Sequence, residues 1–123
     1  MLNGLFFIVD YTLSGRNEMF GRTNNSNSSK SSGIIRESIV FRGDVQGVGF
    51  RYTAKYTARN YGLTGWVMNE WDGSVIMEVQ GPREVIDLMI LNLKEDRYIG
   101  IDDIERTSIR VEEDETKFKV RFN

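Results

Sequence analysis

A short apolar run and a run with helical periodicity are joined by Gly43-Asp44-Val45-Gln46-Gly47-Val48-Gly49-Phe50-Arg51. Residues 38–42 are largely apolar or β-branched and predict a strand, whereas apolar residues recur at helical spacing over 50–61. At a helix N-terminus, unpaired N–H groups and the positive end of the helix dipole favour an anion, and glycines allow successive amides to turn inward. Arg51 adds a guanidinium that matches two phosphate oxygens. The loop therefore predicts a site for an oxyanion of phosphate or sulfate size.

Two common nucleotide-binding motifs do not fit the same glycines. In the loop of ATPases a lysine and then a serine or threonine follow the last glycine, whereas Phe50 follows Gly49 here. The dinucleotide fingerprint runs G-x-G-x-x-G, but the order in this chain is G-x-x-x-G-x-G. On composition alone, a turn that merely joins a strand to a helix explains these glycines equally well.

Two separate blocks resemble the signatures of the acylphosphatase family. The first is Val45-Gln46-Gly47-Val48-Gly49-Phe50-Arg51. The second is Gly62-Leu63-Thr64-Gly65-Trp66-Val67-Met68-Asn69 followed by Asp72-Gly73-Ser74-Val75, at the family's usual distance downstream. Two motifs in this order are more specific than either alone, and the resemblance extends from about Ile35 to Asn123. It implies an enzyme that hydrolyses the carboxyl-phosphate anhydride of acyl phosphates to a carboxylate and inorganic phosphate.

The resemblance also implies the roles of individual residues. Arg51 takes the position of the family's catalytic arginine, and Asn69 that of the asparagine that orients the attacking water, a role that suits a carboxamide because it both accepts and donates hydrogen bonds. The phosphate is expected on the backbone amides of Gln46, Gly47, Val48, Gly49, Phe50 and Arg51. The resemblance implies that the substrate phosphate itself can take the proton of the water, and we expect no metal ion and no cofactor.

Two residues depart from the family pattern. Asp44 places a carboxylate in the loop where a neutral or basic residue is more usual, which weakens anion binding if the side chain points into the loop. Glu70 follows Asn69 where some relatives have a small hydroxyl residue. Asn69 by itself is also explained as a residue at the end of a hairpin, because asparagine is frequent beside turns. The presence of Asn69 together with the loop that carries Arg51 favours a role for Asn69 in the active site over a role in the hairpin alone.

The composition restricts the chemistry and the partners. The chain has 123 residues, of which 40% are hydrophobic, enough for one small domain with an ordinary core. It has no cysteine and no histidine, which excludes a disulfide framework, a thiolate nucleophile, catalysis by imidazole and the usual zinc sites. A formal net charge of -2 argues against bulk binding of nucleic acid. We expect a monomer that binds a small-molecule acyl phosphate and neither nucleic acid nor a membrane.

The N-terminal part differs in composition from the rest. We expect a flexible extension and Ser/Asn-rich linker at 1–33 and an acylphosphatase-like domain at 34–123. The apolar run at 5–9 is too short to cross a bilayer and lacks the features of a secretory signal, so we expect a cytoplasmic protein. Three alternatives remain for this run: a peptide that docks on a partner, a short added strand, or sequence carried over from a wrongly assigned start.

From Ile35 onward, periodicities of two and of three to four residues alternate and predict an α+β domain. Strands are expected over 37–42, 65–69, 74–80, 104–112 and 117–122, and helices over 50–61 and 82–94. This order is the ferredoxin-like βαββαβ plan, an antiparallel sheet with two helices on one face. We expect Gly62 to end the first helix in the left-handed conformation, and Phe118, Val120 and Phe122 to face the core.

Two other functions are compatible with the predicted fold. A ferredoxin-like sheet can serve as an RNA platform, but such platforms need exposed aromatic residues on the central strands, and 75–80 has none. The second alternative is an acylphosphatase-like domain that binds phosphate or another anion without turnover. Because both Arg51 and Asn69 are present, we expect the enzyme.

Overall fold

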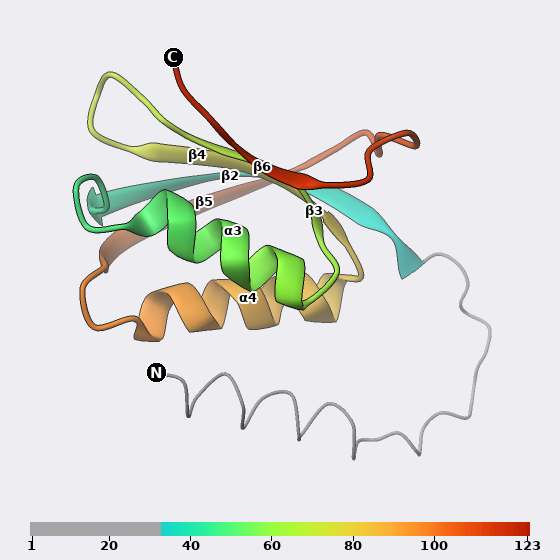
Figure 1. Ribbon diagram of the computed structural model, residues 1–123, viewed down its shortest axis with the longest axis horizontal. Helices are drawn as coiled ribbons and strands as arrows, with labels where there is room; N and C mark the ends of the chain where they lie inside the picture. Colours follow the sequence, from blue (N-terminus) through green and yellow to red (C-terminus); the bar gives the residue numbers. More distant parts are fainter. Residues whose placement is uncertain (1–32) are drawn as a thin grey trace. The chain divides into compact units, whose positions relative to one another are not determined.

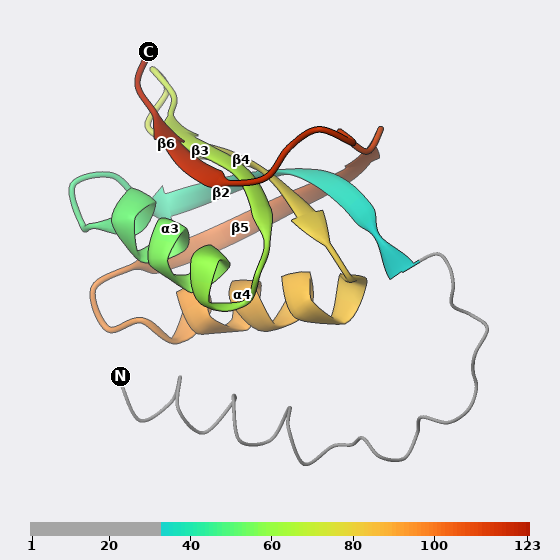
Figure 2. The same cartoon turned by 45° about the vertical axis from the view of Figure 1, so that its right-hand side comes forward.

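The computed structural model describes residues 33–123. In chain order the elements are β2 (Ile35–Asp44), α3 (Phe50–Asn60), β3 (Thr64–Asn69), β4 (Val75–Gly81), α4 (Arg83–Glu95), β5 (Gly100–Ile109) and β6 (Phe118–Arg121) (Figure 1). One sheet contains the strands in the order β5-β2-β4-β3-β6. Both helices cover the same face of this sheet (Figures 1 and 2). The predicted ferredoxin-like α+β plan is confirmed.

The sheet is mixed, because its last pairing is parallel. β2 pairs antiparallel with β4 and β5, and β3 pairs antiparallel with β4, as the βαββαβ plan predicts. β6 instead lies parallel to β3, with Met68 opposite Arg121. The end of β3 and the residues that follow β6 therefore lie at the same end of the sheet.

A continuous apolar core lies between the sheet and the two helices. Its largest fully buried side chains include Phe41, Phe50, Met77, Met89 and Phe118. In α4, the buried residues Ile86, Met89, Ile90 and Leu93 recur at the three-to-four spacing that gives a helix one apolar face. Full burial of such a side chain contributes roughly 1.5–3 kcal/mol, so these faces dominate the attachment of the helices to the sheet.

The end of α3 is fixed by Gly62, as the sequence predicts. Gly62 has a φ of 74°, in the left-handed region. Its N–H donates to the carbonyl of Arg59 at 3.1 Å, and the N–H of Leu63 donates to the carbonyl of Ala58 at 2.8 Å. These two bonds form a Schellman motif, which satisfies carbonyls at the end of the helix and turns the chain into β3.

On the sheet face away from the helices, a buried arginine joins three segments. Arg36 of β2 is 2% exposed, and its guanidinium pairs with Glu78 of β4 at 2.9 Å and with Glu115 at 2.7 Å. Burial acts against the charge of Arg36, but the hydrogen bonds to Glu115 and Glu78 outweigh it and raise its pKa. The cluster therefore holds the segment before β6 against the sheet.

Two strand predictions need correction at the C-terminal end. β5 begins at Gly100 and ends at Ile109, whereas a strand over 104–112 was expected. β6 contains only Phe118 to Arg121, so the alternation of inward and outward side chains stops there. Phe118 is buried and Val120 half-buried, but Phe122 is 69% exposed, and the prediction that it faces the core is wrong. The short pairing with β3 explains this difference.

The predicted extension at 1–33 lies outside the described residues, except for Gly33, and the limits of the two predicted parts stay a prediction. Residues 34–123 form one compact unit. Within the described part of the chain, no helix has both the length and the apolar character needed to cross a membrane.

Candidate active site

The glycine-rich loop between β2 and α3 is anchored at both ends by buried side chains. Val45 and Phe50 are almost fully buried, and the ring of Phe50 packs against Phe41 of β2 with centroids 4.9 Å apart. Between the anchors, Gly47 and Gly49 are exposed and have φ values of 76° and 83°, which L side chains rarely adopt. The loop is thus attached to the core while its backbone remains accessible.

Within 33–123, the backbone N–H groups of 46–51 in this loop have no hydrogen-bond acceptor. The N-cap of α3, Gly49, has no side-chain cap, and the first turn contains no acidic residue. Asp44 is exposed and lies opposite Gly100 of β5. Free donors at the positive end of a helix dipole are the elements of an anion site.

Asn69 lies on the helix-covered face of the sheet. It pairs with Val75, which in turn pairs with Phe41, and both partners are fully buried on that face. Residues directly opposite each other in a sheet point to the same side, so the Asn69 side chain lies on the side of α3. Its Oδ1 is buried and accepts no hydrogen bond from any side chain or backbone group within 33–123.

The side chain of Gln46 connects the loop to the hairpin between β3 and β4. Its Nε2 donates to the carbonyl of Glu70 at 2.8 Å and to the carbonyl of Ser74 at 2.8 Å. Glu70 and Ser74 are the two ends of the hairpin turn, where the N–H of Glu70 donates to the carbonyl of Ser74. The loop and the hairpin lie at the same end of the sheet (Figures 1 and 2). This contact attaches the loop to the backbone of Glu70, the residue that follows Asn69 in the sequence.

The hairpin turn itself is fixed by Asp72. The Oγ of Ser74 donates to Asp72 Oδ1 at 2.6 Å, and the N–H of Ser74 donates to the same oxygen at 2.9 Å. These hydrogen bonds favour the ionised carboxylate and lower the pKa of Asp72, with a smaller contribution from the charge of Arg42. The turn after Asn69 is therefore held by a charged side chain.

Arg51, in the first turn of α3, has an aromatic neighbour. Its guanidinium carbon lies 5.0 Å from the centroid of the Phe122 ring. No ion pair joins it to a carboxylate of the described residues. The adjacent Asn123 donates from Nδ2 to the carbonyl of Asn69 at 2.8 Å. Of the two residues that follow β6, Phe122 thus contacts Arg51 and Asn123 contacts Asn69.

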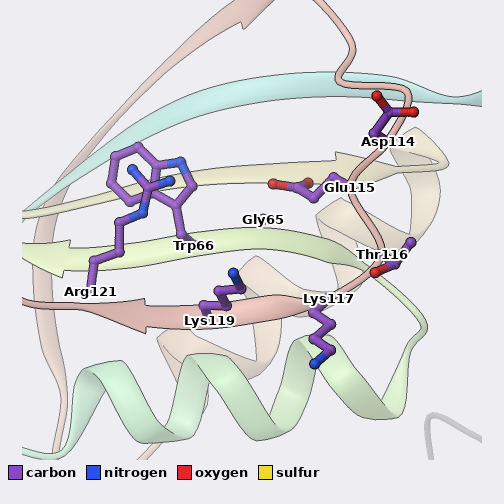
Figure 3. A pocket seen from close by; sticks show the side chains of 8 residues that line it. All are labelled: Gly65, Trp66, Asp114, Glu115, Thr116, Lys117, Lys119 and Arg121. Carbon is purple, nitrogen blue, oxygen red and sulfur yellow. The ribbon is translucent and has the colours of Figure 1, made fainter.

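A pocket of about 250 Å³ lies elsewhere, along β3 and β6. It is lined by Gly65, Trp66, Asp114, Glu115, Thr116, Lys117, Lys119 and Arg121 (Figure 3). Trp66 and Arg121 lie on the side of the sheet away from α3, and the guanidinium carbon of Arg121 is 4.3 Å from the indole ring. None of these residues belongs to the predicted site, so the pocket is not the predicted phosphate site.

The structure brings the predicted site residues to one end of the sheet, although their roles remain predictions. Only the backbone of Gln46 was predicted to belong to the site, and the contact of its side chain with the hairpin was not predicted. Phe122 and Asn123 were not predicted either. No local pattern could have shown these two residues, because their position depends on the parallel pairing of β6 with β3.

Comparison with known proteins identifies the family. A family model described as Acylphosphatase matches residues 37–120. An acylphosphatase of Clostridium beijerinckii is 36% identical over 90 residues, which cover 72% of this chain and 100% of that protein. The chain belongs to the acylphosphatase family.

Solved structures agree with this result. The crystal structure of acylphosphatase from Bacillus subtilis matches with a TM-score of 0.66 and 32% identity, and the match covers 71% of this chain and 98% of that one. The structure of an acylphosphatase from Coxiella burnetii matches with a TM-score of 0.68 and 30% identity, covering 76% of this chain and 99% of that one. This chain therefore shares its fold with solved acylphosphatases.

Proposed function

We propose that this chain hydrolyses acyl phosphates by binding the phosphoryl group between Arg51 and the amides of 46–51, with Asn69 directing the attacking water. As a member of its family the chain is an acylphosphatase, a hydrolase that converts an acyl phosphate to a carboxylate and inorganic phosphate. The proposal concerns the residues that perform this reaction.

The observation that carries the proposal is the buried, unsatisfied Oδ1 of Asn69. A buried acceptor without a donor costs about 1–3 kcal/mol, and most buried polar atoms in proteins have a partner. Within 33–123 this oxygen has none. A water that donates a hydrogen bond to Oδ1 would satisfy it, and the same bond would orient a lone pair of the water towards the phosphorus.

The loop supplies the other requirement of phosphoryl transfer, stabilisation of charge on the three non-bridging oxygens. The N–H groups of 46–51, which donate no hydrogen bond within 33–123, suit those oxygens because they lie at the N-terminus of α3. Arg51 adds a permanent positive charge and a planar set of donors, which no carboxylate within 33–123 occupies. Asp44 is exposed and lies opposite Gly100 of β5, and its effect on anion binding stays a prediction.

In the proposed reaction, the water oxygen attacks phosphorus and the bond between phosphorus and the acyl oxygen breaks. The carboxylate leaves with the electron pair of that bond, and a proton of the water passes to a phosphoryl oxygen. A carboxylate is a good leaving group, so the step requires no protein acid. We expect the reaction to require no metal ion and no cofactor, because Arg51 and the loop amides can stabilise the charge on the phosphoryl oxygens.

The test is hydrolysis of benzoyl phosphate in the presence of excess EDTA by the full chain, Arg51→Ala and Asn69→Ala. We expect EDTA-resistant turnover by the parent and loss of turnover in both folded variants. A folded parent without turnover would favour the alternative, an acylphosphatase-like domain that only binds phosphate. Turnover that EDTA abolishes and a divalent cation restores would contradict the metal-free reaction.

We further propose that the chain acts as a cytoplasmic monomer on a small molecule, without a nucleic-acid or membrane partner. The net charge of -2 supports the absence of a nucleic-acid partner. Sedimentation velocity over a range of concentrations tests the monomer, and fractionation of cells that produce the chain tests its location. A concentration-dependent dimer, or recovery with the membrane fraction, would contradict these parts of the proposal.

A further inference from the structure

We infer that Phe122 and Asn123 are positioning residues for the active site: Phe122 orients the guanidinium of Arg51 for the phosphate, and Asn123 fixes the backbone of Asn69. The inference rests on the proposed function, which assigns phosphate binding to Arg51 and direction of the water to Asn69. Neither Phe122 nor Asn123 lies in the blocks that resemble the family signatures.

The parallel pairing of β6 with β3 brings these residues to the site. Met68 of β3 lies opposite Arg121 of β6, and in a parallel pair both strands run towards the same end of the sheet. The next residues, Asn69 and Phe122, therefore leave their strands side by side. The contact with Arg51 places Phe122 on the side of α3, whereas Arg121 contacts Trp66 on the face away from α3.

Within 33–123, the guanidinium of Arg51 contacts the ring of Phe122 and donates no hydrogen bond to an oxygen. A cation over an aromatic ring is attracted to the face of the ring, and the distance of 5.0 Å lies within the usual range of about 6 Å. A carboxylate partner would instead occupy the in-plane N–H groups that bind two oxygens of a phosphate. Phe122 can therefore restrict the rotamers of Arg51 without competing with the substrate.

Exposure argues against a purely structural role for Phe122. Its side chain is 69% exposed, so it buries little apolar surface and adds little to the core. Asn123 is also exposed, and its hydrogen bond to the carbonyl of Asn69 links two positions 54 residues apart. Within 33–123, no hydrogen bond to Oδ1 holds the Asn69 side chain in place. The hydrogen bond from Asn123 to the Asn69 carbonyl therefore helps to fix the position of that side chain by fixing its backbone.

The first test compares Phe122→Leu with Phe122→Trp in the full chain, using inhibition by inorganic phosphate and kinetics with benzoyl phosphate. Leucine keeps apolar bulk but has no π face, so we expect the inhibition constant for phosphate to rise and kcat/KM to fall about two- to fivefold. Tryptophan, the best cation–π partner, should restore both values to within about twofold. Thermal midpoints should be unchanged in both variants.

A matched control is Tyr98→Leu. Tyr98 is 67% exposed and has the guanidinium carbon of Arg97 at 5.8 Å, but neither belongs to the site. This variant should keep the phosphate inhibition constant of the parent. An equal rise in Tyr98→Leu and Phe122→Leu, or no rescue by tryptophan, would overturn the assignment of Phe122.

The second test is Asn123→Ala, which removes the donor to Asn69. We expect kcat to fall about two- to tenfold, as for loss of one neutral hydrogen bond, with the phosphate inhibition constant unchanged. An unchanged kcat would overturn the role of Asn123. If Phe122→Leu behaves like the parent while Arg51→Ala loses phosphate binding, the inference is wrong and the proposed function stands. If Arg51→Ala keeps full phosphate affinity, the proposed function is wrong and the inference falls with it.

Discussion

Gln46 Nε2 donates a hydrogen bond to the carbonyl of Glu70 at 2.8 Å across 24 residues of sequence. With the second bond, to Ser74, this amide joins the glycine-rich loop to the hairpin that follows Asn69. The side chain of Gln46 therefore contributes to the relative position of the two halves of the predicted site. This contribution leads to the first prediction.

Gln46→Met should weaken the site more than the fold. Methionine keeps the length of the side chain but cannot donate to the two carbonyls, so the free energy of unfolding should fall by about 1–3 kcal/mol. Because positioning dominates phosphoryl transfer, we expect kcat/KM to fall at least about tenfold. Urea unfolding and benzoyl phosphate kinetics on the same samples measure both. A stability loss with unchanged kcat/KM would show that the contact has no role in alignment.

Arg51 and Asn69 should separate binding from turnover. Arg51→Ala should abolish detectable phosphate binding and reduce kcat/KM by about 10³-fold or more. The substitution removes the guanidinium whose positive charge stabilises the negative phosphoryl oxygens. Asn69→Ala should retain much of the phosphate affinity and lose about 10²-fold or more in kcat. Phosphate inhibition or calorimetric titration of each variant provides the measurement. If Asn69→Ala lost phosphate affinity as completely as Arg51→Ala, its role in directing water would have to be abandoned.

Two glycines of the second signature block should differ strongly in their tolerance of a methyl group. A Cβ at Gly65 would collide with the backbone oxygen of Glu78 on the neighbouring strand, whereas a Cβ at Gly62 meets nothing within 4 Å. Gly62→Ala should therefore lower the free energy of unfolding by only about 1–2 kcal/mol, the penalty for an alanine in the left-handed conformation. Gly65→Ala must also separate β3 from β4 and should cost about 3 kcal/mol or more. Equal unfolding free energies in the two variants would contradict this difference.

Asp72 should contribute to stability in a pH-dependent way. The hydrogen bonds from Ser74 lower its pKa in the folded state, so the unfolded chain binds the proton more tightly. The contribution is complete above the ordinary pKa of aspartate, about 3.9, and is lost as the pH falls through the lower folded pKa. Unfolding free energies of the parent should thus fall more steeply below about pH 4 than those of Asp72→Asn. Parallel curves for the two proteins would contradict the prediction.

Removal of residues 1–33 should leave the activity within about threefold of the full chain. The expectation rests on residues 34–123, which form a compact unit and carry both signature blocks, and small domains of this size fold alone. Benzoyl phosphate kinetics and thermal unfolding of the truncated and full chains are the measurements. A truncated chain that unfolds or loses most of its rate would show that the N-terminal part is structural.

Local patterns in the sequence were sufficient for much of the fold. The start of α3 at Phe50, its end before Gly62 and the two arms of the hairpin follow from periodicity and from residues that suit turns, because these features depend on neighbours in sequence. The signature blocks, likewise contiguous, indicated the family and the roles proposed for Arg51 and Asn69.

Features that depend on partners distant in sequence required the tertiary structure. An alternating run such as 117–122 fits a parallel or an antiparallel neighbour equally well, and only the register of Met68 with Arg121 places Phe122 beside Arg51 rather than in the core. The same holds for Gln46, whose acceptors are backbone carbonyls that any sequence would provide. The sequence by itself therefore determined the family, the element order and the proposed reactive groups, because short-range periodicity and motifs encode them. Only the packing of β6 and of the hairpin decided which side chains surround those groups, because long-range pairing leaves no local pattern.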